Sequence, residues 1–301
     1  MIDPSENVGR AVAEAFGGHY ATTLDALPLA SFDAAVVAVP DLLHEDVACA
    51  LLRAGKPVLV EKPMAHTLAA AQAIARAERD GGGRLLVGHI LRFDPRYVAA
   101  AAAVKAGRIG TPVHASSGRF TLRDVGERMS GASSPCFYLG IHDVDALQWI
   151  TGASVRTVYA RAVGSAPGEP DAIFTTCEMT DGLVGQLHCG WTLPSNSPTG
   201  IWARTEVIGT EGIVDLDVRD GGLRLLTGER WSLPDTLHWP DTNGRISGDL
   251  FEEIQHFVRA VRDDAPFAIA TDEALRAVAV NDAILRSIAS NRVETVAEWR
   301  I

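Results

Sequence analysis

Residues 33–63 read DAAVVAVPDLLHEDVACALLRAGKPVLVEKP, and this stretch decides the fold of the first third of the chain. Residues 33–39 are a short apolar run that ends at Pro40, as expected for a strand buried on both faces of a parallel sheet. Residues 43–54 have the spacing of an amphipathic helix, and residues 57–60 are the next apolar run. The order strand, helix, strand with short breaks predicts a βαβ unit.

The same alternation continues on the C-terminal side of this stretch. Residues 67–80 are an alanine-rich predicted helix that Thr67 can cap, three glycines break it, and residues 84–88 are a third apolar strand. We therefore predict an α/β fold with a Rossmann-type parallel sheet. This dinucleotide-binding domain is expected to cover residues 1–93.

From about residue 112 the β-prone segments follow one another almost without intervening helices. Such a series predicts a large, open, mostly antiparallel sheet, and residues 94–301 are assigned to one α+β domain. Turns at residues 181–182 and 220–222 fit hairpins. The predicted strands cover residues 112–120, 155–163, 172–180, 183–191 and 203–208, and the predicted helices cover residues 95–106, 140–150, 248–262 and 272–290.

The composition excludes several classes of protein. The chain has 301 residues, and 47% of them are hydrophobic, which excludes a disordered chain. Its net charge of −11 disfavours nucleic acid as a partner, and no apolar run reaches the roughly 18 residues of a membrane helix. Four cysteines without CxxC spacing predict reduced thiols. No zinc-like spacing is present, so no metal is expected, and the absence of a signal-peptide pattern predicts a cytoplasmic location.

The residues most suggestive of chemistry are Glu61, Lys62 and Pro63, at the end of a predicted strand. Ligands of open α/β sheets bind just beyond the carboxyl ends of the strands. A lysine at this point can direct its charge into that crevice, and the proline after it restricts the backbone. A lysine in this position is more commonly a solvated loop residue. The motif alone therefore does not establish a functional site, and other segments of the chain are needed to support one.

With the rest of the chain considered, the sequence resembles the glucose-fructose oxidoreductase, inositol dehydrogenase and MocA (GFO/IDH/MocA) family of NAD(P)-dependent oxidoreductases. The similarity spans essentially the whole chain, and the Glu-Lys-Pro and Gly-Ile-His-Asp motifs are its most specific parts. The matching segments are residues 37–40, His44, 54–56, 61–63, 88–95, 140–145, Trp149, 209–212 and the final helices.

The resemblance implies that Lys62 and His142 face the substrate and the nicotinamide. His142 would take the proton of a secondary hydroxyl while hydride leaves for the nicotinamide, and Lys62 would stabilise the developing alkoxide. Family members often have an aspartate four residues before this histidine, where this chain has Tyr138. Tyr138 is therefore a third candidate catalytic residue. Either it contributes to substrate binding, or the proton relay differs from that of family members with the aspartate, or the active site is altered.

The resemblance also implies which residues bind the cofactor. Asp3 matches the acidic residue that binds the adenosine ribose, which favours NAD over NADP. Alternatively, Asp3 or Ser5 could cap the helix predicted directly after them in this chain. His44 is equally compatible with packing. The other residues expected to bind the cofactor are Val39, Pro40, Asp41, Glu61, Lys62 and Arg92.

No G-x-G-x-x-G motif precedes the first recognisable strand pair. By the family pattern about 30 residues are missing before Met1, namely the first strand, the glycine-rich turn and the first helix. One expectation is that the chain is a truncated form of a longer protein. The other is that the fold has been rebuilt, and a rebuilt chain could be a redox-inactive accessory protein that holds no cofactor.

The resemblance implies that the domain of residues 94–301 serves substrate binding and oligomerisation. It also implies a small molecule as substrate, namely a sugar, an inositol or a nucleotide sugar. Hydride transfer at a secondary hydroxyl is the expected reaction, and NAD-assisted glycoside cleavage or epimerisation is the alternative. The uncovered face of the predicted sheet suggests a homodimer or homotetramer. Trp191, Trp202, Trp231 and Trp239 are expected to pack in the sheet or in interfaces, unless one of them lines a sugar site.

Overall fold

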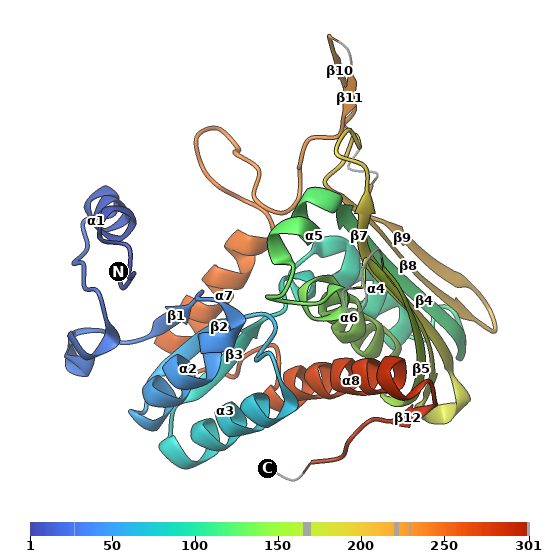
Figure 1. Cartoon of the computed structure of the whole chain (residues 1–301), viewed down its shortest axis with the longest axis horizontal. Helices are drawn as coiled ribbons and strands as arrows, with labels where there is room; N and C mark the ends of the chain where they lie inside the picture. The colour runs from blue at the N-terminus through green and yellow to red at the C-terminus, as the bar shows by residue number, and fades with distance from the viewer. Residues whose placement is uncertain (27, 165–169, 220–222, 229, 300–301) are drawn as a thin grey trace.

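A computed structural model describes residues 1–26, 28–164, 170–219, 223–228 and 230–299. The hairpin turn expected at residues 220–222 lies outside these residues. The chain forms a small parallel sheet and a large mixed sheet, with helices packed between them (Figure 1). The Rossmann-type sheet and the mostly antiparallel second sheet that the sequence predicts are therefore confirmed.

The small sheet contains the βαβ units of the first third of the chain. Its parallel strands lie in the order β1 (Ala35–Val37), β2 (Pro57–Glu61) and β3 (Arg84–Gly88). Helices α2 (His44–Arg53) and α3 (Leu68–Gly81) pack on each other, and short 3-10 turns η1 (Leu24–Ala26), η2 (Leu29–Ser31) and η3 (Asp41–Leu43) flank β1. Residues 58–60 have no exposed surface, which explains why this strand is uniformly apolar.

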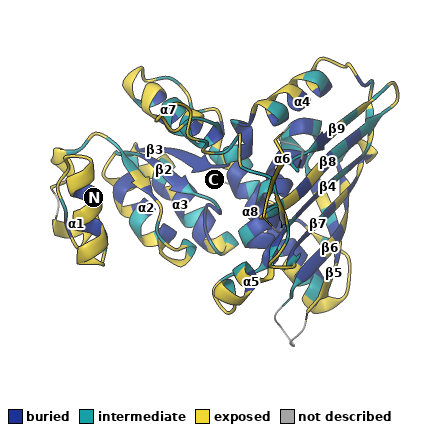
Figure 2. Ribbon diagram, turned by 90° about the horizontal axis from the view of Figure 1, so that it is seen from above, coloured by how far each residue is buried: buried dark blue, intermediate teal, exposed yellow. Residues whose placement is uncertain are grey.

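The second face of the small sheet is covered by a helix from the far end of the chain. Leu59 and Leu86 form a core of their own with Ile269 and with Phe257 of α7 (Asp249–Arg262). All four side chains are at most 3% exposed. Figure 2 shows the small sheet between α7 on one side and α2 and α3 on the other. The segment assigned to the second domain thus also completes the layers of the first.

The first residues form α1 (Glu6–Ala15), as the sequence predicts, at the end of the molecule farthest from the large sheet (Figure 1). The Ser5 amide donates a hydrogen bond to Asp3 Oδ1 at 2.7 Å, so Asp3 takes part in the turn that starts the helix. Gly17 follows the helix with a φ of +67°, a left-handed conformation that is typical of a glycine at the C-terminal end of a helix.

The large sheet has the strand order β12-β5-β6-β7-β4-β8-β9, and every described pairing in it is antiparallel except that of β4 with β7. Asp181 and Gly182 both have positive φ in the turn between β6 and β7, which confirms the predicted hairpin. The strands are β4 (Pro112–Leu122), β5 (Val155–Val163), β6 (Ala172–Met179), β7 (Val184–Leu193), β8 (Ile201–Gly209), β9 (Ile213–Asp217) and β12 (Glu294–Thr295), with β10 (Leu225–Thr227) and β11 (Arg230–Ser232) in a separate hairpin.

Helices cover one face of the large sheet (Figure 2). They are α4 (Pro95–Lys105), α5 (Arg123–Met129), α6 (Ile141–Thr151) and α8 (Thr271–Ser290), with a π-helical turn η5 (Cys136–Gly140) directly before α6. α8 contacts β5, α6 and α3, so the two sheets share one continuous core. The sequence pattern predicts neither α5 nor η5. None of the described helices is both long and apolar enough to cross a membrane.

We expect Phe257→Ala to lower the free energy of unfolding by about 3–5 kcal/mol, because it removes a buried ring from the contact between α7 and the small sheet. Urea unfolding followed by circular dichroism measures this change. Val258→Ala is the matched control, since Val258 is 53% exposed on the same helix and should change the free energy by about 0.5 kcal/mol or less. Equal losses in the two variants would contradict the packing role of Phe257.

Candidate active site

Lys62 joins the carboxyl end of the small sheet to the second part of the chain. Its Nζ atom donates a hydrogen bond to the Tyr138 main-chain carbonyl at 3.1 Å and lies 4.8 Å from the centroid of the Tyr138 ring. Tyr138 belongs to η5, and the next helix, α6, carries His142 in its first turn. The two motifs that the resemblance singles out therefore meet at the crevice where an open α/β sheet binds its ligands.

His44 braces the backbone on either side of this crevice. The side chain is buried, with Nδ1 3.0 Å from the Pro63 carbonyl oxygen and Nε2 2.9 Å from the Val39 carbonyl oxygen. His44 thus ties the loop after β1 to the loop after β2. Because backbone groups engage both ring nitrogens, this geometry gives His44 a positioning role and provides no support for a contact between these nitrogens and a cofactor.

The surroundings of Lys62 make its charge easier to lose. Burial is the main cause that lowers the pKa of Lys62, and the positive charge of Arg119 lowers it further. The carboxylates of Glu61 and Asp41 oppose this shift. A lysine whose pKa is lowered in this way can donate a hydrogen bond and can also exchange a proton closer to neutral pH.

His142 is half-buried in the first turn of α6. Burial, and after it the positive charges of Lys62 and Arg119, hold the pKa of His142 well below its ordinary value of 6.5. Its Nδ1 atom has no hydrogen-bond partner among the described residues. Tyr138 contacts Lys62 through its carbonyl group and its ring face, and neither contact uses the hydroxyl that a proton relay would need.

A buried polar network holds the start of α6 behind His142. Asp143 accepts a hydrogen bond from Ser117 Oγ at 2.8 Å and another from Arg119 Nε at 3.0 Å. Arg119 Nη2 also donates to the Tyr97 hydroxyl at 3.3 Å. All four side chains of the network are buried. Because both charges are paired, the network can fix α6 against β4 without leaving an isolated buried ion.

Arg92, which the resemblance assigns to the cofactor, is engaged elsewhere. Its Nε and Nη2 atoms donate to the two Asp145 carboxylate oxygens at 2.8 and 2.7 Å, and Nη1 donates to Glu273 at 3.2 Å. The guanidinium carbon lies 4.9 Å from the centroid of the Trp149 ring. These contacts assign Arg92 to holding the end of β3 against α6 and α8, and they provide no support for a contact with the cofactor.

The sequence motifs assign no site role to His89. It follows β3, is 1% exposed, and has Nδ1 3.9 Å from the Asp145 carboxylate, which is too long for a hydrogen bond. Neither ring nitrogen has a hydrogen-bond partner among the described residues. Burial lowers the pKa of His89, which lies close enough to Lys62 and His142 to interact with both charges. The one sequence feature that could have indicated a site role for His89 is its position directly after an apolar strand.

Further titratable groups, which no sequence motif indicates, lie at and near the start of α7. His238 Nδ1 lies 2.7 Å from Asp249 Oδ2, while Asp249 Oδ1 and Glu253 Oε1 are buried without a partner among the described residues. Burial and neighbouring carboxylates raise the pKa of Glu253 to about 8. Asp94, His238 and Asp249 are close enough to share a metal ion, but the Arg96 guanidinium already pairs with Asp94 at 2.6 Å and would repel a cation.

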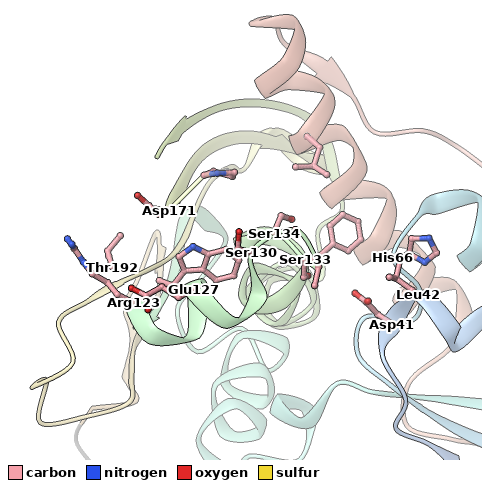
Figure 3. Close-up of a pocket in the computed structure, with 17 residues that line it drawn as sticks. Asp41, Leu42, His66, Arg123, Glu127, Ser130, Ser133, Ser134, Asp171 and Thr192 are labelled. Atoms are coloured by element: carbon pink, nitrogen blue, oxygen red, sulfur yellow. The ribbon is translucent and has the colours of Figure 1, made fainter. Parts of the chain in front are cut away.

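A cavity of about 590 Å³ lies next to η5, where Phe137 and Trp191 line it. It lies between the two parts of the chain. Figure 3 shows Asp41, Leu42 and His66 on one side, Arg123, Glu127 and Thr192 on the other, and Ser130, Ser133 and Ser134 between them. The cavity is therefore a place where a ligand could touch both domains beside the Lys62 contact. Of the four tryptophans considered above, Trp191 lines this cavity.

The carboxyl edge of the small sheet holds several residues that the resemblance assigns to the cofactor. Val39, Pro40 and Asp41 follow β1, and Glu61 ends the neighbouring strand β2. A Cβ atom added at Gly88 would lie 3.3 Å from the Glu61 carboxylate, so glycine leaves room for it. A carboxylate at this edge can accept hydrogen bonds from ribose hydroxyls. The contact of Asp3 with the Ser5 amide supports its alternative role at the helix start, and its contact with a ribose stays a prediction.

Sequence comparison matches both parts of the chain to one family. Residues 1–89 match the "Oxidoreductase family, NAD-binding Rossmann fold", and residues 97–215 match the "GFO/IDH/MocA C-terminal domain". The scyllo-inositol 2-dehydrogenase (NAD(+)) of Bacillus subtilis (strain 168) is 30% identical over 242 residues, which cover 77% of this chain and 68% of that protein. Inositol 2-dehydrogenase 2 of Saccharopolyspora erythraea is 34% identical over 197 residues, 62% of this chain and about half (55%) of that protein.

Comparison with solved structures agrees. The crystal structure of GenD2 from gentamicin A biosynthesis in complex with NAD superposes with a TM-score of 0.85 and 29% sequence identity, covering 99% of this chain and 88% of that one. The fold formed by the parallel sheet and the large sheet thus has a counterpart in a solved structure, and the sequence matches both domain models of one oxidoreductase family. The chain belongs to the GFO/IDH/MocA oxidoreductase family.

Proposed function

We propose that the protein is an NAD-dependent dehydrogenase that oxidises a secondary hydroxyl of an inositol or sugar ring. The observation that carries this proposal is the 3.1 Å hydrogen bond from Lys62 to the Tyr138 carbonyl, since it places Lys62 beside the helix start that holds His142. Relatives that are named as inositol dehydrogenases support it. A redox-inactive accessory role is not favoured, because these relatives are named as dehydrogenases.

In the proposed reaction, the oxidation of the hydroxyl carbon to a carbonyl would be completed by a bound NAD⁺, which would supply the acceptor for the hydride. His142 accepts the hydroxyl proton, and its low pKa keeps the imidazole neutral and ready for this step at neutral pH. Lys62 donates a hydrogen bond to the same substrate oxygen and stabilises the alkoxide charge as it develops. The carbonyl and ring of Tyr138 hold the Lys62 ammonium group in place.

NAD is proposed over NADP because Asp3 is acidic, and a carboxylate at the adenosine ribose repels a 2′-phosphate. The names of the Bacillus subtilis relative and of the GenD2 complex, which both include NAD, support this preference. A cytoplasmic location also belongs to the proposal. It is supported by the four cysteines, all of which are free thiols.

We further propose that a second copy of the chain covers the open face of the large sheet. Phe120, His188 and Phe174 stack across this face, with ring centroids 6.0 and 6.3 Å apart. Gly118 leaves room for the histidine, because a Cβ atom there would lie 2.1 Å from the His188 ring. Phe174 is 47% exposed and Trp202 is 44% exposed, and such aromatic surface is typical of protein interfaces.

We expect Lys62→Met and His142→Gln each to lower kcat/KM for myo-inositol oxidation by a factor of about 10²–10⁴, because each removes a group that acts on the reacting oxygen. Steady-state formation of NADH measures this loss, and fluorescence titration with NADH checks that the cofactor still binds. Lys105→Met is the matched control, since Lys105 is exposed at the end of α4. Full activity in either site variant would reject the assigned role.

Both the acid and the alkaline limb of the pH profile of kcat/KM should be shifted to lower pH than the ordinary pKa values of histidine and lysine would give. His142 must be neutral to accept the proton, and its pKa lies below 6.5, so activity should persist as the pH falls from 8 to 6.5 and decline only below that. Lys62 must be charged to stabilise the alkoxide, and its pKa is lowered from 10.5, so the alkaline decline should have its midpoint below 10.5. An acid midpoint at or above 6.5 would contradict the assignment of His142 as the base. An alkaline limb that stays unchanged in Lys62→Arg would contradict the assignment of Lys62 as the group that stabilises the alkoxide.

Light scattering at micromolar concentration should give the mass of a dimer or a larger oligomer. We expect Phe174→Asp to reduce this mass to that of one chain, because it places a charge among the stacked rings of the open face. Val258→Asp is the matched control, because Val258 is exposed on α7, away from the large sheet. A monomeric parent protein would overturn this part of the proposal.

A further inference from the structure

We propose that Glu253 is a positioning residue for the cofactor. Glu253 and Glu61 form a carboxyl pair with a single negative charge, in which Glu253 keeps the proton and Glu61 keeps its carboxylate available for the hydroxyl groups of a ribose. This inference rests on the proposed function, because NAD is the cofactor assigned there. It is carried by the way α7 packs on the small sheet, by the burial of Glu253 and by the pairing of the cations around it.

Helix α7 brings Glu253 to the end of the small sheet. Leu59 and Glu61 lie two residues apart in β2, so their side chains point to the same face of the sheet. On that face Leu59 packs against Phe257 of α7. Glu253 lies four residues before Phe257 on the same buried stripe of the helix, and the Glu61 charge is close enough to act on it. The helix therefore covers Leu59 with a ring and the Glu61 end of the strand with a second carboxyl group.

The Glu61 carboxylate lies over Gly88 on this face of the sheet. Glu61 is paired with Gly88 in the parallel ladder, and a Cβ atom at Gly88 would lie 3.3 Å from Glu61 Oε2. The Lys62 amide donates a hydrogen bond to the same oxygen at 3.3 Å. Glu61 is half-buried, so its carboxylate is held close to the backbone and can still reach a ligand at the carboxyl edge.

The surroundings of Glu253 favour its neutral form. The residue is 1% exposed, and Oε1 has no hydrogen-bond partner among the described residues. An ionised carboxylate that is buried without a cation is costly, so such a group keeps its proton. Burial, and after it the negative charges of Glu61 and Asp249, raise the pKa of Glu253 to about 8. At neutral pH the pair therefore has one charge, which Glu61 holds because it is the more exposed of the two.

The elements around Glu253 carry several other titratable groups, and most of these already have partners. The pairs are Lys62 with the Tyr138 carbonyl, Arg92 with Asp145 and Glu273, Arg96 with Asp94, His238 with Asp249, and His256 with the Ala268 amide. The pKa of His89 is lowered by burial, which favours its neutral ring. Ionisation of Glu253 would therefore place a second negative charge near Glu61 without adding a cation to balance it.

This arrangement makes the affinity for the cofactor depend on pH. When Glu253 ionises, its charge repels the Glu61 carboxylate, and the ribose hydroxyl groups lose a well-placed acceptor. We expect the dissociation constant of NADH to rise by at most about tenfold between pH 7 and pH 9. This is the factor by which a group with a pKa of about 8 loses its protonated form over that range.

Fluorescence titration of the full chain with NADH between pH 7 and pH 9 tests this expectation. The parent protein should show the rise in the dissociation constant, and Glu253→Gln should not, because its amide stays neutral at every pH. Glu252→Gln is the matched control, since Glu252 is exposed at the neighbouring position of α7 and should keep the pH dependence of the parent. A merely structural role of Glu253 would weaken binding equally at every pH.

Urea unfolding tests the pair without the cofactor. The ordinary pKa of Glu253 is 4.5, and the folded protein raises it to about 8. Between these values the unfolded chain releases the proton more readily, so the equilibrium constant for unfolding should rise with pH by up to about tenfold per pH unit relative to Glu253→Gln. Glu61→Gln removes the neighbouring charge, so the rise should end at a lower pH than in the parent. This second variant tests the pair even where Glu253→Gln does not fold.

The outcomes separate this inference from the proposed function. An NADH affinity that does not change with pH, or the same rise in Glu253→Gln as in the parent, overturns the inference and leaves the dehydrogenase assignment intact. An unfolding profile that is unchanged in Glu61→Gln also overturns it. The expected unfolding profiles together with no binding of NADH to the parent protein support the single-charge pair and reject NAD as its ligand, and with it the proposed function.

Discussion

The buried ion pair between Arg92 and Asp145 is the interaction on which the candidate site depends. Arg92 ends the loop after β3, and Asp145 lies one turn after His142 on α6, so their two hydrogen bonds set the distance between the small sheet and the helix with the candidate base. Glu273 of α8 completes the pairing of the guanidinium. Removing one partner of a buried pair typically costs about 3–5 kcal/mol, because the other charge stays buried alone. The position of His142 opposite Lys62 thus follows from charges that take no part in the proposed chemistry.

Helix α7 shows how one segment can serve packing and chemistry together. Its buried stripe is Asp249, Glu253, Phe257 and Ala260, so acidic side chains face inward near the site and apolar ones face inward beneath the small sheet. Burial raises the pKa of Glu253 to about 8, which means that the fold holds a carboxyl group in its neutral form at neutral pH. The carboxyl edge of the small sheet therefore has a polar neighbour, while the middle of the sheet keeps a dry core with Leu59 and Leu86.

Local patterns in the sequence predicted most of the secondary structure, because apolar spacing and glycine breaks act within a few residues. The helix expected at 67–80 is α3 at 68–81, and the strand expected at 84–88 is β3. The same patterns missed η5, since the bonding of a π-helical turn depends on what packs around it: Asn281 of α8 donates to the Cys136 carbonyl at its start. They also could not show that β4 pairs in parallel with β7, because pairing between distant strands leaves no local trace.

The sequence by itself determined the parallel βαβ units and the series of strands after residue 112, since these follow from local spacing. Its resemblance to a known family singled out Lys62 and His142 as a candidate pair. Only the tertiary structure decided which charged residues are free to act. His44 and Arg92 turned out to be occupied by backbone carbonyls and by Asp145, while His89, Ser133 and Glu253 retain buried atoms without partners in the described structure. The physical reason is that the desolvation and pairing of a side chain depend on neighbours that can be far away in the sequence. Tyr138, for example, contacts Lys62 from 76 residues along the chain.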